Sequence, residues 1–128
     1  MTQQIPNAAE RITFIALHGH DDPEIAILPF MLGVAALAMD VTVTIVLQGP
    51  AVMLAHKGVA GHVFAGCEGT SLGTLMDQFL ELGGTLIVCT PCAESRKLGK
   101  EQMIDGVELV KAARVVTELL GSNATLTF

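Results

Sequence analysis

The chain has 128 residues, of which 51% are hydrophobic and 16% charged, and its formal net charge at pH 7 is −6. This composition is too apolar for a disordered protein, and the length fits a single domain over residues 1–128. Seven Lys and Arg against thirteen Asp and Glu leave no basic surface for a nucleic acid. The apolar content is high for so small a monomer, which predicts a homo-oligomer.

The N-terminal part predicts a strand, a loop and a helix. Arg11–Leu17 is almost continuously apolar, as in a strand covered on both faces. The loop His18–Asp21 follows it. Asp22 has the chemistry of a helix N-cap and Pro23 that of a first helical residue, so a helix is expected to begin there.

The apolar stretch Ile25–Leu47 has the length of a membrane span. Pro29 and Gly33 interrupt it, and Asp40 divides it from the β-branched run Val41–Leu47. The stretch therefore predicts a buried helix followed by a buried strand, and no membrane segment is expected.

The rest of the chain continues the alternation of helices and strands. Its predicted elements are a short helix over Ala51–Lys57, a long loop over Gly58–Gly73, a helix over Leu72–Leu82, a strand over Thr85–Val88, a helix with Thr90 as N-cap and Pro91 in first position, a short strand over Val107–Val110, a helix over Lys111–Leu120 and a strand over Ala124–Phe128. Such alternation predicts an α/β protein with a mostly parallel sheet and helices on both faces.

Ligands of parallel α/β sheets bind beyond the carboxyl ends of the strands. This rule selects three loops as the candidate site: His18–Asp22, Gln48–Pro50 and Cys89–Cys92.

Cys89 and Cys92 are the predicted catalytic residues. They are spaced C-x-x-C where a strand meets a helix, and a thiol at a helix N-terminus ionises more readily. Arg96 adds positive potential, and a thiolate is the form that attacks sulfur. Cys89 is the stronger candidate because the strand end fixes it, although both could be small buried apolar residues. Three cysteines are a poor basis for disulfides, so reduced thiols in the cytoplasm are expected.

The remaining polar candidates are His18 and His20, which are predicted to line the pocket together with Arg96. Together with Asp21, the two histidines could instead form a metal site or an acid–base site, and these alternatives stay open. Cys67 is interpreted as a residue without a functional role. The alternatives are that it acts as a resolving thiol or as a metal ligand. No metal and no cofactor are predicted.

Several segments together resemble the DsrE/DsrF-like (YchN-like) family: Gly19-His20-Asp21-Asp22-Pro23, Ala26-Ile27-Leu28-Pro29-Phe30, Val41-Thr42-Val43-Thr44-Ile45, and Val88-Cys89-Thr90-Pro91-Cys92 followed by Arg96. The resemblance covers essentially the whole chain. It implies a flavodoxin-like three-layer fold with about five mainly parallel strands, assembled as trimers or hexamers. It further implies sulfur trafficking, with Cys89 matching the cysteine that carries a persulfide. The family's Arg-Gly pair is Arg96-Lys97 here.

The leading hypothesis is a cytoplasmic sulfur carrier, and a sulfurtransferase activity is left open. Cys89 takes sulfane sulfur from a donor protein, and the cysteine of an acceptor protein receives it. The alternatives are a dithiol–disulfide oxidoreductase that uses Cys89 and Cys92, and a binding module for a small anionic ligand in which the thiols are passive.

Overall fold

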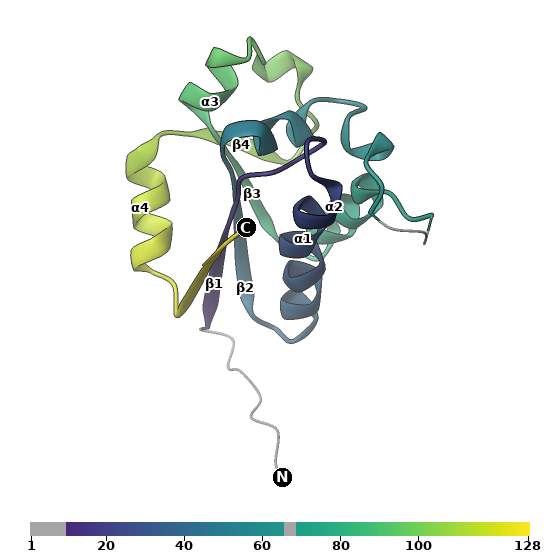
Figure 1. Ribbon diagram of the computed structural model, residues 1–128. Coiled ribbons are helices and arrows are strands. Elements are labelled where there is room, and N and C mark those ends of the chain that lie inside the picture. Colours follow the sequence, from purple (N-terminus) through teal and green to yellow (C-terminus); the bar gives the residue numbers. More distant parts are fainter. Residues whose placement is uncertain (1–9, 66–68) are drawn as a thin grey trace.

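Five parallel strands form the sheet at the centre of the molecule, in the order β4-β3-β2-β1-β5 (Figure 1). The computed structural model describes residues 10–65 and 69–128. The strands are β1 (Arg11–Ala16), β2 (Thr42–Leu47), β3 (Thr85–Cys89), β4 (Val107–Val110) and β5 (Ala124–Thr127). The predicted α/β class and five-stranded sheet are confirmed.

Helices cover both faces of the sheet, which gives the three layers that were predicted. The α-helices are α1 (Pro23–Ala38), α2 (Leu72–Glu81), α3 (Thr90–Ser95) and α4 (Ala112–Leu120). Figure 1 shows α1 and α2 on one face and α4 on the other, with α3 beyond the end of the sheet. The shorter 3₁₀ helices are η1 (Gly49–Ala55), η2 (Ala60–His62) and η3 (Lys100–Gln102).

The sheet register brings the ends of β1, β2 and β3 side by side. Ala16 pairs with Leu47, and Leu47 pairs with Val88, so these three strands end within one or two residues of one another. The loops that follow them therefore begin at the same edge of the sheet, as the sequence predicted.

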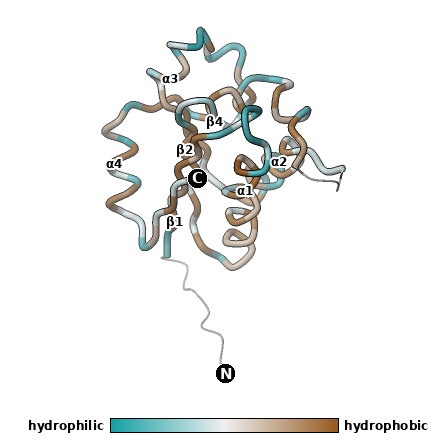
Figure 2. The backbone as a smooth tube through the Cα atoms, viewed as in Figure 1, coloured by the Kyte–Doolittle hydropathy of each residue, from teal (hydrophilic) through white to brown (hydrophobic). Residues whose placement is uncertain are grey.

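Alternate residues of β2 contribute to two cores of unequal size. Val43, Ile45 and Leu47 belong to the larger core, which the packing of α1 and α2 closes. Val46 points to the other face and meets Val115 of α4 in a small cluster. Figure 2 shows the apolar strands at the centre of the molecule. The larger core makes the α1–α2 face the main source of hydrophobic stabilisation.

A polar anchor also holds α4 to the sheet. Glu118, whose side chain is only 12% exposed, accepts hydrogen bonds from Thr44 on β2 and from Arg114 on its own helix. Arg11 of β1 lies 3.8 Å from the same carboxylate. The hydroxyl of Thr44 is buried, so this carboxylate satisfies a donor that would otherwise lack a partner.

Two predicted segments differ from the structure. The helix expected over Ala51–Lys57 is the 3₁₀ helix η1, which begins two residues earlier at Gly49. It is a short connector without a side-chain cap, and the tighter 3₁₀ turn is common in such pieces. The expected loop Gly58–Gly73 contains η2 and an antiparallel bridge between Phe64 and Ser71.

The described part of the chain contains no helix with both the length and the hydropathy needed to cross a bilayer. The stretch Ile25–Leu47 instead forms most of α1 and all of β2, as predicted.

Candidate functional site

Cys89 and Cys92 lie at the carboxyl edge of the sheet, where β3 passes directly into α3. Cys89 is the last residue of β3 and the N-cap of α3, and Cys92 lies in the first turn of this helix. Both residues are half-buried and carry free thiols. Each thiol affects the pKa of the other, so the two form one site.

The two thiols differ in acidity. The pKa of Cys92 is lowered: burial opposes ionisation, but the Cys89 thiol, the backbone N–H of Gly49 and the charge of Arg96 together outweigh it. The pKa of Cys89 is raised by burial and by the adjacent Cys92 thiol, against the lowering effect of the Cys92 backbone N–H. The expectation that Cys89 is the stabilised thiolate is therefore wrong, because the favourable neighbours surround Cys92.

Gly49 supplies the contact that sequence reasoning missed. Its backbone N–H, at the start of η1, faces the sulfur of Cys92. Gly49 has a φ of 54°, in the left-handed region that favours glycine. The rule about strand ends selected the loop Gln48–Pro50, but it could not tell which of the two thiols this N–H would reach.

Arg96 folds back over α3 toward Cys92. It caps the C-terminus of the helix, and its Nη1 donates to the carbonyl of Cys92 at 3.2 Å and to Ser95 Oγ at 3.4 Å. The guanidinium is exposed and stands on the α3 side of the thiol pair. Its positive charge favours the thiolate of Cys92.

Thr90 has a different role from the one predicted. Cys89 takes the N-cap position, Thr90 is the first helical residue and Pro91 the second. The Thr90 hydroxyl donates to the carbonyl of Val110 at 2.8 Å, which ties the start of α3 to the end of β4. The prediction failed because Cys is a rare N-cap and Thr a common one.

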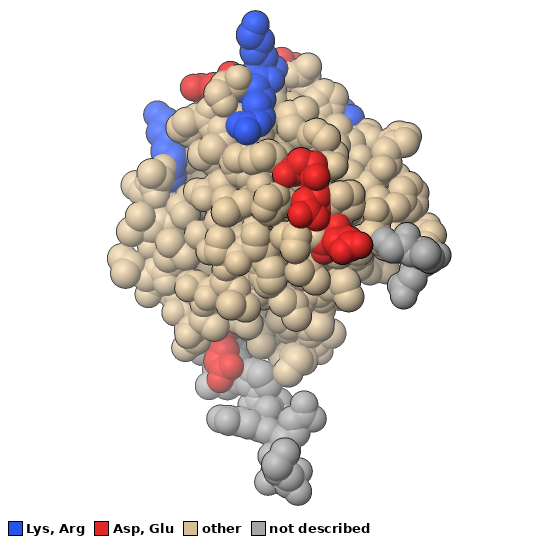
Figure 3. Space-filling view, viewed as in Figure 1, with Lys and Arg blue, Asp and Glu red and all other residues tan. Residues whose placement is uncertain are grey.

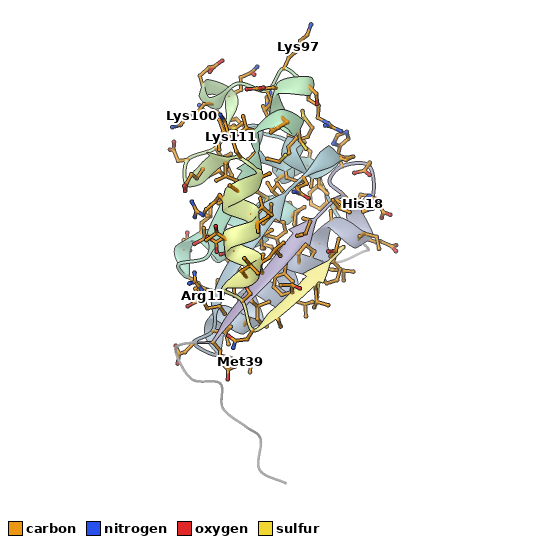
Figure 4. All side chains as sticks on the ribbon, turned by 90° about the vertical axis from the view of Figure 1, so that its left-hand side faces the viewer. Arg11, His18, Met39, Lys97, Lys100 and Lys111 are labelled. Atoms are coloured by element: carbon orange, nitrogen blue, oxygen red, sulfur yellow. The ribbon has the colours of Figure 1, made fainter. Side chains whose placement is uncertain are left out.

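His18 and His20 lie in the loop after β1, at the end of the sheet opposite Arg11 and Met39 (Figure 4). His18 is hydrogen-bonded to Asp21 through Nδ1 at 2.8 Å, whereas His20 is exposed. The loop packs against η1, since a Cβ on Gly19 would lie 3.2 Å from the carbonyl oxygen of Pro50. The sheet edge thus brings both the loop of His18 and the thiol of Cys92 next to the first turn of η1.

Other candidate positions lie away from this edge. A cavity of about 270 Å³ between η1, η2 and α2 is lined by His56, Ser71 and Asp77, and neither cysteine lines it. Within residues 10–65 and 69–128, no group of three His, Cys, Asp or Glu side chains could hold a metal ion. Cys67 lies outside the described residues.

Taken together, the fold and the site define a parallel α/β protein with an ionisable thiol pair beyond the carboxyl ends of its strands. A family model, the DsrE/DsrF-like family, matches residues 10–128, so the chain belongs to that family. The family is associated with sulfur relay. No curated protein matches the chain in sequence.

Solved structures share the fold at low sequence identity. The YchN protein from E. coli superposes with a TM-score of 0.79 at 19% identity, covering 93% of this chain and 99% of that one. MTH1491 from Methanobacterium thermoautotrophicum gives a TM-score of 0.68 at 12% identity, with 91% and 98% covered. BT1422 from Bacteroides thetaiotaomicron gives a TM-score of 0.66 at 18% identity, covering 94% of this chain and 97% of that one. The latter two are described as proteins of unknown function, so these matches show the architecture alone.

Proposed function

We propose that the protein carries sulfane sulfur as a persulfide on its cysteine pair, accepting it from a donor protein and passing it to an acceptor protein. The observation that supports this proposal is the thiol pair at the sheet edge, in which the pKa of Cys92 is lowered by Gly49 of η1 and by Arg96 at the end of its own helix. A thiolate is the nucleophile that sulfur exchange requires.

The surroundings of Cys92 favour it as the attacking thiol, because the Gly49 N–H and the charge of Arg96 both stabilise its thiolate and neither acts on Cys89. Its thiolate attacks the terminal sulfur of a donor persulfide, R–S–SH. The bond from Cys92 Sγ to that sulfur forms, the donor S–S bond breaks, and the donor leaves as R–S⁻. Cys92 then holds the persulfide, and Cys89 lies beside it as a second thiol. This assignment replaces Cys89 as the proposed carrier and keeps it in the site.

The second candidate function is a dithiol–disulfide oxidoreductase, which the contact between the two thiols favours. In that reaction the pair would reduce a disulfide and be oxidised to a Cys89–Cys92 disulfide. A reducing compartment such as the cytoplasm would keep both thiols free between cycles.

Mass spectrometry after exposure to glutathione persulfide, and separately to a mild oxidant, distinguishes the two functions. A carrier gains one sulfur atom on the peptide that contains Cys92, and Cys92→Ser abolishes this gain. Cys89→Ser is the matched control and retains it. A disulfide as the only product would support the oxidoreductase. Sulfur gain by Cys92→Ser would contradict the assignment of the persulfide to Cys92, and a wild type that gains neither sulfur nor a disulfide would leave the thiols passive and contradict either function.

We also propose that the chain self-associates through the outer side of α1. A stripe of apolar residues runs along this side at spacings of three and four, partly exposed at Ile25 and Leu28 and exposed at Leu32, Ala35 and the C-cap Met39. Glu24 is the one charged residue of this helix. Figure 3 shows acidic side chains near the start of α1 and a broad surface without charged side chains below them. Two helices pack along stripes of this spacing, and the same helix of a second copy provides a matching one.

A further inference from the structure

His18 and Asp21 form a hydrogen-bonded pair that fixes the state of the imidazole. Nδ1 of His18 lies 2.8 Å from Oδ2 of Asp21, and Oδ1 of Asp21 accepts the backbone N–H of Gly19 at 2.6 Å. Because an ionised carboxylate only accepts hydrogen bonds, Nδ1 carries the hydrogen. In the neutral ring Nε2 then keeps its lone pair, which is the arrangement of a base oriented by a carboxylate.

Asp21 is held in its ionised form. Burial raises its pKa, but the Gly19 N–H and the His18 ring more than offset this, so that the pKa lies below the ordinary value. The carboxylate is therefore available to orient His18 at neutral pH. The His18 side chain is 40% exposed, so a docking partner can reach the ring.

The loop of His18 and the thiol of Cys92 meet at the first turn of η1. Gly19 packs against the carbonyl of Pro50, and the N–H of the preceding Gly49 faces the sulfur of Cys92. β1 and β3 are the two neighbours of β2, so their ends are separated by two strand spacings, about 10 Å. The two loops thus lie on neighbouring parts of the same sheet edge, where a partner that docks over η1 meets both of them.

We propose that His18 is the general base of the release step and that Asp21 is its positioning residue. This inference rests on the proposed carrier function. Nε2 of His18 takes the proton of an acceptor thiol, R′–SH. The resulting R′–S⁻ attacks the terminal sulfur of the Cys92 persulfide, the bond from Cys92 Sγ to that sulfur breaks, and R′–S–SH leaves. Cys92 departs as the thiolate, the form that Gly49 and Arg96 favour.

The test compares two acceptors of the sulfur from the loaded protein. Glutathione is largely protonated at neutral pH and needs the base, whereas 4-nitrothiophenol is already ionised and does not. His18→Asn slows release to glutathione at least about tenfold and leaves release to 4-nitrothiophenol unchanged. Asp21→Asn acts in the same direction, and His62→Asn, which changes an exposed histidine on η2, is the matched control with wild-type rates.

Each alternative result overturns the inference. Equal slowing with both acceptors would show that His18 only supports the local structure, and an unchanged glutathione rate would show that it takes no proton. If the wild type loads no sulfur at all, the carrier function falls and this inference falls with it. If it loads sulfur and His18→Asn has no effect, the carrier function stands and only the role of His18 is refuted.

Discussion

Lys97, directly after the Arg96 that caps α3, adopts a left-handed backbone conformation with a φ of 56°. A residue with a Cβ is strained in this region, and glycine is not. Lysine therefore occupies a backbone turn that glycine would adopt without strain. Figure 4 shows the Lys97 side chain directed outward at the end of the molecule.

Replacing this residue tests the strain directly. We expect Lys97→Gly to raise the free energy of unfolding by up to about 1 kcal/mol, measured by urea denaturation. Lys97→Ala is the control, since it removes the charge and keeps the strain, and it should stay within about 0.5 kcal/mol of the wild type. A loss of stability in Lys97→Gly would show that the strain is compensated by the side chain.

Arg96 offers a second prediction at this scale, on the acidity of Cys92. The rate of alkylation by iodoacetamide follows the thiolate fraction and so rises with pH until the thiol is ionised. Because the pKa of Cys92 is lowered, its rate should reach the plateau below the pH typical of a free thiol, and before that of Cys89. Arg96→Met removes a charge that favours the thiolate, which should move the Cys92 inflection to higher pH.

Peptide-resolved alkylation over a pH series measures this shift. Lys57→Met, which removes a cation remote in sequence from the thiol pair, is the control and should leave the inflection in place. A Cys89 that reacts first, or an Arg96→Met profile equal to the wild type, would contradict the assignment of the thiolate to Cys92.

The residues of the site were predictable to different degrees. The C-x-x-C spacing and the strand-end rule placed Cys89 and Cys92 at the sheet edge, and the structure has them there. The order of their acidities was not predictable, because it depends on an N–H donated by Gly49, which lies 43 positions before Cys92 in the sequence. A contact of this kind is decided by tertiary packing and leaves no local pattern.

At the scale of elements, α2 and η2 approach so closely that the contact requires glycine. A Cβ added to Gly73 would lie 2.9 Å from the backbone nitrogen of Gly61 and 3.0 Å from its Cα. These neighbours are main-chain atoms, so they cannot move aside as a flexible side chain could. The contact holds η2 against the first turn of α2.

Gly73→Ala should therefore destabilise the protein by about 1–3 kcal/mol, the usual cost of overpacking. Gly61→Ala is a closely matched control: its φ is not positive and a Cβ there would meet nothing within 4 Å. It should change the stability by no more than about 0.5 kcal/mol. Equal effects of the two substitutions in thermal or chemical unfolding would show that the backbones separate without cost.

The strands and α-helices were predicted well, including short ones such as Val107–Val110, and the 3₁₀ helices were predicted poorly. The helix beginning at Pro23 has an Asp22 cap whose side chain accepts the N–H of Ile25, as the sequence indicated. η1 was predicted as a helix in the wrong place, and η2 was not predicted, because a 3₁₀ turn of three to seven residues has no periodicity to detect. The order of the strands in the sheet likewise depends on packing and required the structure.

At the scale of the whole molecule, the two layers of helices are unequal. α1 and α2 close the large core, while α4 alone covers the other face and buries one residue, Val115. Apolar side chains stay exposed on both sides, Leu32 at 44% on α1 and Leu120 at 83% on α4. The surplus of apolar residues seen in the composition is therefore at the surface.

Self-association through α1 makes a prediction that separates these two surfaces. Leu32→Glu puts a charge into the proposed interface and should lower the mass measured by light scattering to that of the monomer. Leu120→Glu, which places the same charge on α4, should leave the mass of the assembly unchanged. A wild type that is already monomeric, or dissociation by Leu120→Glu alone, would refute the assignment to α1.

The pairing of β1 with β5 joins the two ends of the fold: Ile12 lies opposite Ala124, and Asn123 Oδ1 accepts the N–H of Arg11. β1 is synthesised well before β5 and thus gains its second neighbour only after residues 124–127 have left the ribosome. Until then its hydrogen-bonding edge is open to other nascent chains. A chain truncated before residue 124 lacks β5, so the edge of β1 stays unpaired. Such a chain should aggregate and appear in the insoluble fraction on expression.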